Sequence, residues 1–221
     1  MRARIAAAAR RYGRDPKTIR LLAVSKQQPV SALRELVTHG QLQIGESYLQ
    51  EALPKIATLT DLRIEWHYIG QIQSNKTRPI AEQFQWVHTV DRLKIAERLN
   101  EQRLAVSLPL NVCIQVKLGN ESGKGGATPA EIPALAHSVR QLPRLRLRGL
   151  MCLPPPRETF DEQIVYFREC AALLQSLNQT GQSLDTLSMG MSEDLEAAIA
   201  AGATIVRVGT ALFGARNSHR Q

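Results

Sequence analysis

Two short apolar stretches decide how the chain folds: Arg20-Leu-Leu-Ala-Val-Ser-Lys26 and, near the other end, Thr204-Ile-Val-Arg-Val-Gly-Thr210. Runs of this kind predict buried strands of a parallel sheet. Side chains alternate between the two faces of a strand, so Lys26 and Arg207 can both point into the interior of a closed sheet. If the sheet closes, the first and last strands become neighbours, and these two cations converge at the carboxyl end of one barrel.

Such a pair of cations implies a ligand. Two positive side chains placed together away from solvent repel each other and cost free energy to desolvate. An arginine is most often a salt-bridge partner, but the strand around Arg207 offers no acidic residue. A lysine desolvated beside another cation has a lowered pKa, and its neutral amine can form a Schiff base with an aldehyde. We therefore expect an anionic or electron-rich group between Lys26 and Arg207.

Strand-like and helix-like segments alternate along the whole chain. Besides the two stretches above, the predicted strands are residues 42–45, 66–70, 86–90, 110–116, 145–151 and 184–188. The predicted helices are residues 29–39, 46–56, 91–104 and 192–201, with others starting near residues 74, 128 and 159. The pattern predicts a single (β/α)8 barrel over residues 1–221, with an extra N-terminal helix. The alternative is a doubly wound open sheet.

Three helix starts carry a capping signal. Asp91 is a natural N-cap for the helix that follows it. Thr128 with Glu131, and Thr159 with Glu162, have the spacing of a capping box.

Composition limits the class of protein. The chain has 221 residues, 43% of them hydrophobic, and no apolar run near the ~20 residues of a membrane span. Its net charge of +8 raises the question of a nucleic-acid partner, but the basic residues are scattered and no stacking aromatic motif accompanies them. We expect no nucleic-acid or membrane partner.

Two further features bear on the compartment. Residues 1–11 are basic and Ala-rich, which favours an amphipathic helix over a transit peptide. Cys113, Cys152 and Cys170 lack a Cys-x-x-Cys spacing, so we expect reduced thiols in a cytoplasmic protein.

The loops after the last two strands are the expected phosphate site. In such barrels phosphate is commonly held there. They contain Ser188-Met-Gly-Met-Ser192, Gly209 and Thr210. Glycine allows close approach of the backbone, and N–H groups at a helix start suit an anion. Ser192 is alternatively an ordinary helix N-cap, and Gly209-Thr210 a simple turn.

Other motifs carry little chemistry. Gly119-Asn-Glu-Ser-Gly-Lys124 is one residue short of a phosphate-binding P-loop, so we reject that function. The five histidines have no metal-ligand spacing. His67 and His88 lie within predicted strands, where we expect satisfied core or pocket residues.

With these residues in view, the chain resembles the pyridoxal phosphate homeostasis protein family over nearly its whole length. The resemblance is carried by Ala23-Val-Ser-Lys26, Ile44-Gly-Glu-Ser-Tyr-Leu-Gln-Glu51, Trp66-His-Tyr-Ile-Gly70, Gln73-Ser-Asn-Lys76, Arg148-Gly-Leu-Met151, Leu187-Ser-Met-Gly-Met-Ser192, Val206-Arg-Val-Gly209 and Phe213-Gly214. The chain departs from the family at Ser47, where the family usually has Asn. The resemblance implies the barrel of fold-type III proteins such as alanine racemase.

The resemblance also implies a role for individual positions. Lys26 would hold pyridoxal 5′-phosphate as an internal aldimine, and Arg207 would donate to the pyridine nitrogen. The remaining implied contacts are to the phosphate, from Ser192, Gly209 and Thr210, and to the ring, from Met189 and Tyr48. Since guanidinium only donates, the ring nitrogen stays unprotonated and the cofactor is a poor electron sink.

The family resemblance favours a cofactor carrier over an enzyme. Racemases of this fold use a second acid/base group, a tyrosine from an additional β-domain, and the chain ends at Gln221, soon after the last predicted strand. We expect a monomeric protein of vitamin B6 homeostasis and amino- and keto-acid balance that passes cofactor to apo-enzymes, without established turnover. The alternatives are a racemase-like enzyme and a basic binding barrel without cofactor.

Overall fold

The eight predicted strands close into one parallel barrel in a computed structural model that describes residues 1–119 and 125–214. Each strand pairs with the next in the chain, and the last pairs with the first. Closure excludes the open doubly wound sheet. The strands are β1 Arg20–Val24, β2 Gln43–Glu46, β3 Glu65–Tyr68, β4 Trp86–Val90, β5 Leu110–Val116, β6 Leu145–Cys152, β7 Thr186–Ser188 and β8 Ile205–Val208.

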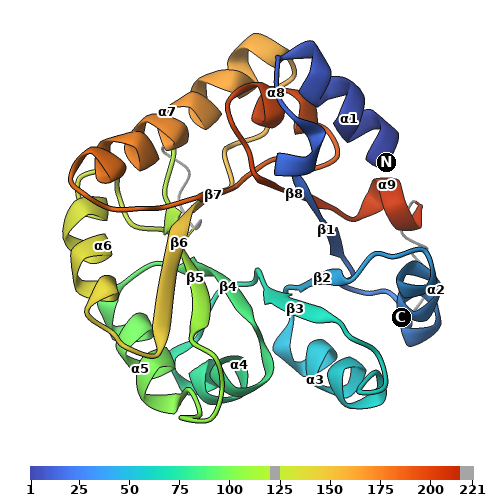
Figure 1. The fold of residues 1–221 in the computed structure, drawn as a ribbon, viewed down its shortest axis with the longest axis vertical. Coiled ribbons are helices and arrows are strands. Elements are labelled where there is room, and N and C mark those ends of the chain that lie inside the picture. Colours follow the sequence, from blue (N-terminus) through green and yellow to red (C-terminus); the bar gives the residue numbers. More distant parts are fainter. Residues whose placement is uncertain (120–124, 215–221) are drawn as a thin grey trace.

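Helices surround the barrel, as Figure 1 shows, and one helix lies between each pair of consecutive strands. An additional helix precedes β1, as predicted, and a short one follows β8. The helices are α1 Arg2–Arg11, α2 Val30–Thr38, α3 Leu49–Thr58, α4 Thr77–Gln83, α5 Leu93–Gln102, α6 Ile132–Arg140, α7 Phe160–Gln179, α8 Leu195–Ala200 and α9 Thr210–Phe213, with 3-10 turns at Pro16–Thr18 and Ser74–Lys76.

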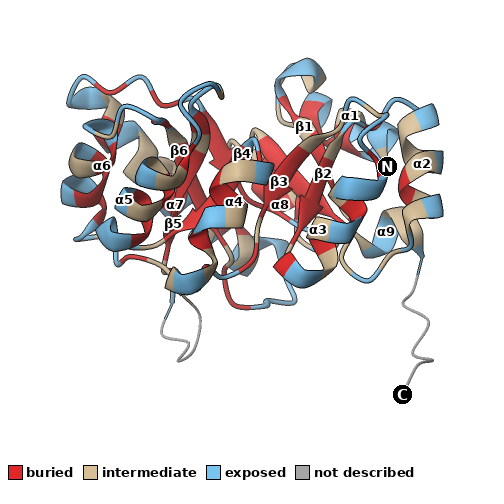
Figure 2. Ribbon diagram, turned by 90° about the horizontal axis from the view of Figure 1, so that it is seen from below, coloured by how far each residue is buried: buried red, intermediate tan, exposed pale blue. Residues whose placement is uncertain are grey.

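Two apolar layers hold this arrangement together. Between strands and helices lies the main core, visible in Figure 2 as the buried band of strands lined by the inner faces of the helices. A second cluster joins side chains from five different strands, and only the barrel interior allows such contacts. It consists of Leu22, Trp86, Cys113, Met151 and Ile205.

The first and last strands lie side by side, as the two organising stretches predict. In their register Leu22 is opposite Arg207, and Ala23 is opposite Val208. Strand β1 ends at Val24, so Lys26 does not end the strand as expected but lies in the turn beyond it. Lys26 is half-buried rather than far from solvent, because a turn at the rim is less enclosed than a strand.

Three of the predicted helix starts move. Arg92, not Asp91, is the N-cap of α5, and the Asp91 carboxylate instead accepts from the Arg92 guanidinium. Asp194, not Ser192, is the N-cap of α8. Helix α6 begins at Ile132, after a turn in which the Thr128 hydroxyl donates to Glu131.

The start of α7 is confirmed. Thr159 and Glu162 form a reciprocal capping box there. This motif needs only residues three positions apart, so it is readable from the sequence.

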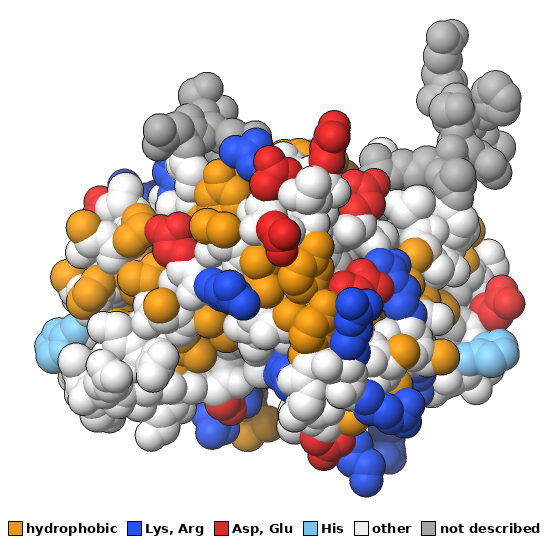
Figure 3. Space-filling model, turned by 90° about the horizontal axis from the view of Figure 1, so that it is seen from above, with side chains coloured by type: hydrophobic (Ala, Val, Ile, Leu, Met, Phe, Trp, Pro, Cys, Tyr) orange, Lys and Arg blue, Asp and Glu red, His pale blue; other side chains and the backbone are white. Residues whose placement is uncertain are grey.

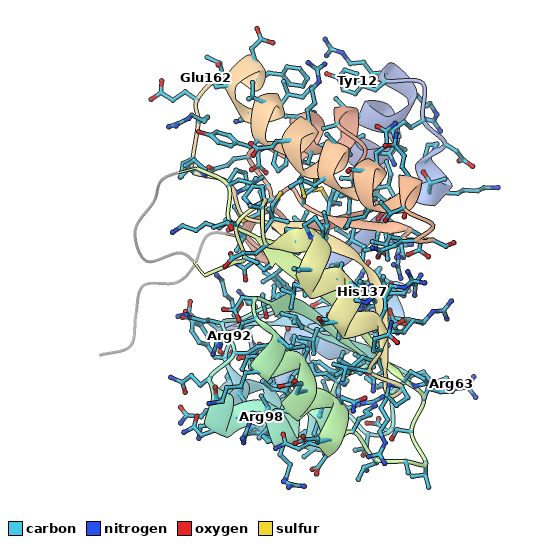
Figure 4. The ribbon with its side chains drawn as sticks, turned by 90° about the vertical axis from the view of Figure 1, so that its left-hand side faces the viewer. Tyr12, Arg63, Arg92, Arg98, His137 and Glu162 are labelled. Carbon is cyan, nitrogen blue, oxygen red and sulfur yellow. The ribbon has the colours of Figure 1, made fainter. Side chains whose placement is uncertain are left out.

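The N-terminal helix packs onto the barrel. Its residues Ile5, Ala8 and Ala9 are buried, and it contacts α8. Figure 4 shows Tyr12, just after α1, near the first turns of α7, where Glu162 lies, and the Tyr12 ring stacks on Phe160 at 5.9 Å between centroids. The basic Ala-rich segment is therefore an amphipathic helix of the fold.

The surface carries side chains of mixed type (Figure 3), and the cysteines lie in the interior. Acidic, basic and hydrophobic side chains are mixed over much of the face in Figure 3. The three cysteines are free and buried, and burial raises the pKa of the Cys113 thiol to about 12. Within residues 1–119 and 125–214 no helix is long and apolar enough to cross a bilayer. Most of the rejected P-loop match, residues 120–124, lies outside the described residues.

Candidate functional site

The carboxyl ends of β1 and β8 form the centre of the candidate site. Gly209, directly after β8, lies against the end of β1: a Cβ added to Gly209 would lie 3.2 Å from the Val24 carbonyl oxygen and 3.5 Å from the Val24 Cβ. A side chain at position 209 would therefore be in tight contact with the end of β1. Helix α9 begins at the next residue, Thr210, whose side chain is exposed.

Arg207 is a buried cation held by neutral groups. It is 4% exposed, and its guanidinium donates to the Ser188 hydroxyl at 2.9 Å and to the Cys152 carbonyl at 2.9 Å. Among the described residues no carboxylate lies within ion-pair distance of it. Burial lowers the pKa of Arg207, but guanidinium starts so high that it stays charged. The barrel therefore holds a positive charge whose nearest partners are uncharged.

The turn that carries Lys26 is fixed through its backbone neighbours. Gln27 is the one non-glycine residue of the described chain with a positive φ, 63°. Its N–H donates to the Glu51 carboxylate at 2.5 Å. On the other side, the Ser25 hydroxyl donates to Glu46 at 2.6 Å, and the Ser25 carbonyl accepts from Lys55 at 2.8 Å. Both residues that flank Lys26 are thus anchored to β2 and α3.

Lys55 links the two carboxylates of this clamp. Its ammonium group donates to Glu46 at 2.8 Å and to Glu51 at 2.5 Å. Glu46 is fully buried, and its second oxygen, Oε2, has no hydrogen-bond partner among the described residues. Burial is the largest influence on the Glu46 carboxyl and raises its pKa, and the hydrogen bonds from Lys55 and Ser25 offset only part of this. We call Ser25, Glu46, Glu51 and Lys55 the Lys26 clamp.

The loop after β7 contains the predicted phosphate residue Ser192. Ser192 lies in a turn just before α8, and its carbonyl accepts from Arg4 of the N-terminal helix at 2.8 Å. The Asp194 carboxylate accepts from the N–H of Met191 at 2.5 Å and closes this turn. The Ser192 side chain is therefore not occupied in capping α8.

Met189 needs a correction. Its side chain is fully buried in the main core between strands and helices. The preceding residue, Ser188, points into the barrel, so alternation turns Met189 outward. The structure does not bring its side chain to the mouth of the barrel.

Tyr48 lies on the other side of the mouth, after β2. It is the N-cap of α3 and its side chain is 54% exposed. The preceding residue, Ser47, has its carbonyl oxygen packed against Gly70, where an added Cβ would lie 1.9 Å from that oxygen. Backbone packing therefore fixes the Ser47–Tyr48 bend whatever the side chain at position 47.

The structure brings most of the predicted site residues to one end of the barrel. The residues that follow the carboxyl ends of β1, β2, β7 and β8 are Lys26, Tyr48, Ser192, Gly209 and Thr210, and Arg207 lies in β8 itself. Sequence reasoning missed the roles of Ser188 and the Lys26 clamp. The four-residue spacing of Glu51 and Lys55 was the available signal for the clamp.

The donor set fits a small anion with a reactive carbonyl group. The site contains an always-charged donor, a primary amine, hydroxyl groups and the N–H groups at the start of α9. His67 and His88 are buried and hydrogen-bonded in the barrel interior, as expected for satisfied core or pocket residues. Among the described residues no group of His, Cys, Asp and Glu is placed to hold a metal ion.

Comparisons with known proteins agree on one family. The model of the family described as "Alanine racemase, N-terminal domain" matches residues 1–217. A pyridoxal phosphate homeostasis protein of Pseudomonas aeruginosa is 60% identical over 215 residues, covering 97% of this chain and 92% of that protein. The protein of the same name from Escherichia coli K12 is 51% identical over 220 residues, covering 98% and 94%.

Solved structures show the same barrel. PipY from Synechococcus elongatus, in a structure with PLP (pyridoxal 5′-phosphate) bound, has a TM-score of 0.84 and 39% identity, covering 97% of this chain and all of that one. Alanine racemase from Corynebacterium glutamicum has a TM-score of 0.69 at 16% identity, covering 99% of this chain and 62% of that one. The second likeness shows the fold alone.

Proposed function

The chain belongs to the alanine racemase N-terminal domain family and, within it, to the pyridoxal phosphate homeostasis proteins, and from this membership we propose that it binds pyridoxal 5′-phosphate in vitamin B6 homeostasis. The observation that supports the proposal is a buried, carboxylate-free arginine in β8 next to the strand that leads into the turn of Lys26. PipY, whose structure has PLP bound, shares 39% identity with the chain.

Each site residue has a proposed task. The Lys26 amine would hold the cofactor's carbonyl carbon, and Arg207 would donate to the pyridine nitrogen. Ser192, Gly209 and Thr210 would bind the phosphate, and the exposed Tyr48 would cover the ring. Met189 supports this region from the core, and we leave its side chain out of the ring contacts.

Arg207 also argues for a carrier. Pyridoxal phosphate supplies an electron sink, which is stronger when its ring nitrogen is protonated. A guanidinium can only donate, so Arg207 would hold that nitrogen unprotonated. We therefore propose a chain that keeps the cofactor bound without turning over a substrate. The test is to incubate the chain with single amino acids in deuterated water. Exchange of the α-proton by the unaltered chain, absent from Lys26→Ala, would contradict the proposal.

Further parts of the proposal concern where the protein acts. We propose a monomer in the cytoplasm that supplies the cofactor to apo-enzymes. The three buried free thiols support a reducing compartment.

The test is chemical trapping at Lys26. The purified chain is mixed with pyridoxal phosphate, reduced with borohydride and mapped by peptide mass spectrometry. The expected result is one adduct on Lys26, absent from Lys26→Ala and kept in Lys17→Ala, which changes a lysine just before the amino end of β1. Equal labelling of several lysines, or none, would reject the proposed site.

A further inference from the structure

A chain of hydrogen bonds crosses the barrel interior from its amino end to Arg207. Glu65, the first residue of β3, contacts His67 Nε2 at 2.8 Å, and His67 Nδ1 contacts His88 Nε2 at 2.9 Å. His88 Nδ1 then contacts the Ser188 hydroxyl at 2.7 Å, which accepts from Arg207 at 2.9 Å. Four strands, β3, β4, β7 and β8, contribute to it. We call these five residues the interior chain.

The two ends of the interior chain determine its direction. Arg207 can only donate, and an ionised Glu65 can only accept. If every hydrogen points toward Glu65, Ser188 accepts from Arg207 and donates to His88, and each histidine accepts at Nδ1 and donates from Nε2. In the opposite direction Ser188 would accept from both His88 and Arg207, and its own hydrogen would need an acceptor that the described residues do not provide. The first direction alone satisfies every member.

The charges agree with this direction. Burial lowers the pKa of His67, and it lowers that of His88 well below its usual value, so both rings are neutral near pH 7. The hydrogen bond from His67 lowers the pKa of Glu65, which keeps that carboxylate ionised. A negative end and a positive end are thus joined through neutral groups. The Glu65 side chain is 37% exposed and meets solvent at the amino end of the barrel.

We propose that Ser188, His88, His67 and Glu65 are positioning residues, which form one directional hydrogen-bond chain that orients the Arg207 guanidinium toward the cofactor site. The inference rests on the proposed function in one respect, the position of Arg207 beside the pyridine ring. Two contacts fix the guanidinium plane, to Ser188 on β7 and to the Cys152 carbonyl on β6. The Cys152 carbonyl belongs to the backbone, so the Ser188 contact is the one that the interior chain controls.

The first test needs no cofactor. Two-bond ¹H–¹⁵N spectra of the chain labelled with ¹⁵N-histidine report which ring nitrogen carries hydrogen. The expected result is that His67 and His88 are both Nε2–H tautomers near pH 7, assigned with His67→Gln and His88→Gln. A hydrogen on Nδ1 of either ring would overturn the direction of the chain and with it the proposal.

The second test removes one link. Ser188→Ala is expected to raise the dissociation constant of pyridoxal phosphate about tenfold or more, the fold-change for losing a hydrogen bond to a charged group. It is also expected to shift the His88 ring resonances in the chain without cofactor. Ser188→Thr keeps the hydroxyl and should restore both. Cys113→Ala, at an interior residue outside the chain, is the matched control.

The outcomes separate the two proposals. Unchanged affinity in Ser188→Ala, or the same loss in Cys113→Ala, overturns the positioning role while the cofactor site stands. If the unaltered chain fails to bind pyridoxal phosphate, the proposed function fails, and the tautomers of His67 and His88 alone decide the interior chain.

Discussion

The two cations of the candidate site are held in different ways. Arg207 lies within a strand, almost fully buried, and its partners are a hydroxyl and a carbonyl. Lys26 lies in a turn beyond a strand, half-buried, and the turn is anchored by the charged groups of Glu46, Glu51 and Lys55. A strand already fixes the backbone of Arg207, so only its side chain needs orienting. A turn has no ladder of hydrogen bonds, so the clamp must order the backbone around Lys26.

The difference extends to how each region responds to pH. Burial raises the pKa of Glu46, which lies near Lys26. Burial lowers the pKa of His67 and His88, which are linked to Arg207 by hydrogen bonds. A raised carboxyl pKa gives stability that is present at low pH and lost as pH rises through the folded-state value. A lowered histidine pKa gives stability that is present at neutral pH and lost on acidification. The contributions of the two regions to stability therefore change with pH in opposite directions.

The largest expected effect comes from breaking the Lys26 clamp. Lys55→Met leaves the Glu46 carboxylate buried without its cation, so it should lower the free energy of unfolding by about 3–5 kcal/mol in urea denaturation. Adding Glu46→Gln should recover part of this, because the unpaired charge is gone.

The matched control is Arg34→Met. The pair between Arg34 and Asp61 is well exposed, so breaking it should lower the free energy of unfolding far less than breaking the buried pair. If Lys55→Met costs no more than Arg34→Met, the clamp does not order the turn.

The next effect is the pH dependence of the Arg207 side. Because the folded pKa of His67 and His88 lies below the usual value near 6.5, the unfolded chain binds protons that the folded chain does not. The free energy of unfolding should fall as pH drops below about 6.5, by up to about 1.4 kcal/mol per pH unit for each histidine. Urea titrations between pH 7.5 and 5 measure this slope.

Two histidine variants make that prediction specific. His88→Gln should reduce the slope by about half, whereas His137→Gln, at an exposed position on α6, should leave it unchanged. An unaltered slope in His88→Gln would show that the buried rings are not its source.

The smallest effect concerns the backbone of the Lys26 turn. Gln27 has a left-handed backbone conformation, which costs an L-residue about 1–2 kcal/mol. Glycine avoids this cost but loses more conformational entropy on folding, which offsets part of the gain. Gln27→Gly should therefore raise the free energy of unfolding by less than about 1 kcal/mol, measured by thermal or urea unfolding. Gln28→Gly, at a neighbouring position without positive φ, should lower it.

Local patterns explain what was readable from the chain. The apolar runs predicted the strands to within a few residues, because burial between two layers imposes a continuous apolar stretch. The capping box at Thr159 was predicted because it depends only on two residues three positions apart. Asp91 and Ser192 are residue types that favour the N-cap, but neither occupies that position. The helices begin one and two residues later, with Arg92 and Asp194 as their N-caps.

The residues of the candidate site also separate into those that local sequence patterns predicted and those that they did not. Lys26 and Arg207 were predicted from strand periodicity and closure. Met189 was named from the family resemblance alone, and the structure buries its side chain in the main core because alternation turns it away from the barrel interior. Ser188 was quoted in a motif, yet nothing local marked it as the partner of Arg207.

By itself the sequence determined the alternation of strands and helices, and the order of its motifs carried the resemblance to one family. Both are properties of neighbouring residues and of composition along the chain. Tertiary structure alone decided that His88 meets Ser188, one hundred positions away, and that Glu46 meets Lys55 beneath the turn of Lys26. Side-chain partners across a barrel depend on register and closure, and these follow from packing of the whole chain.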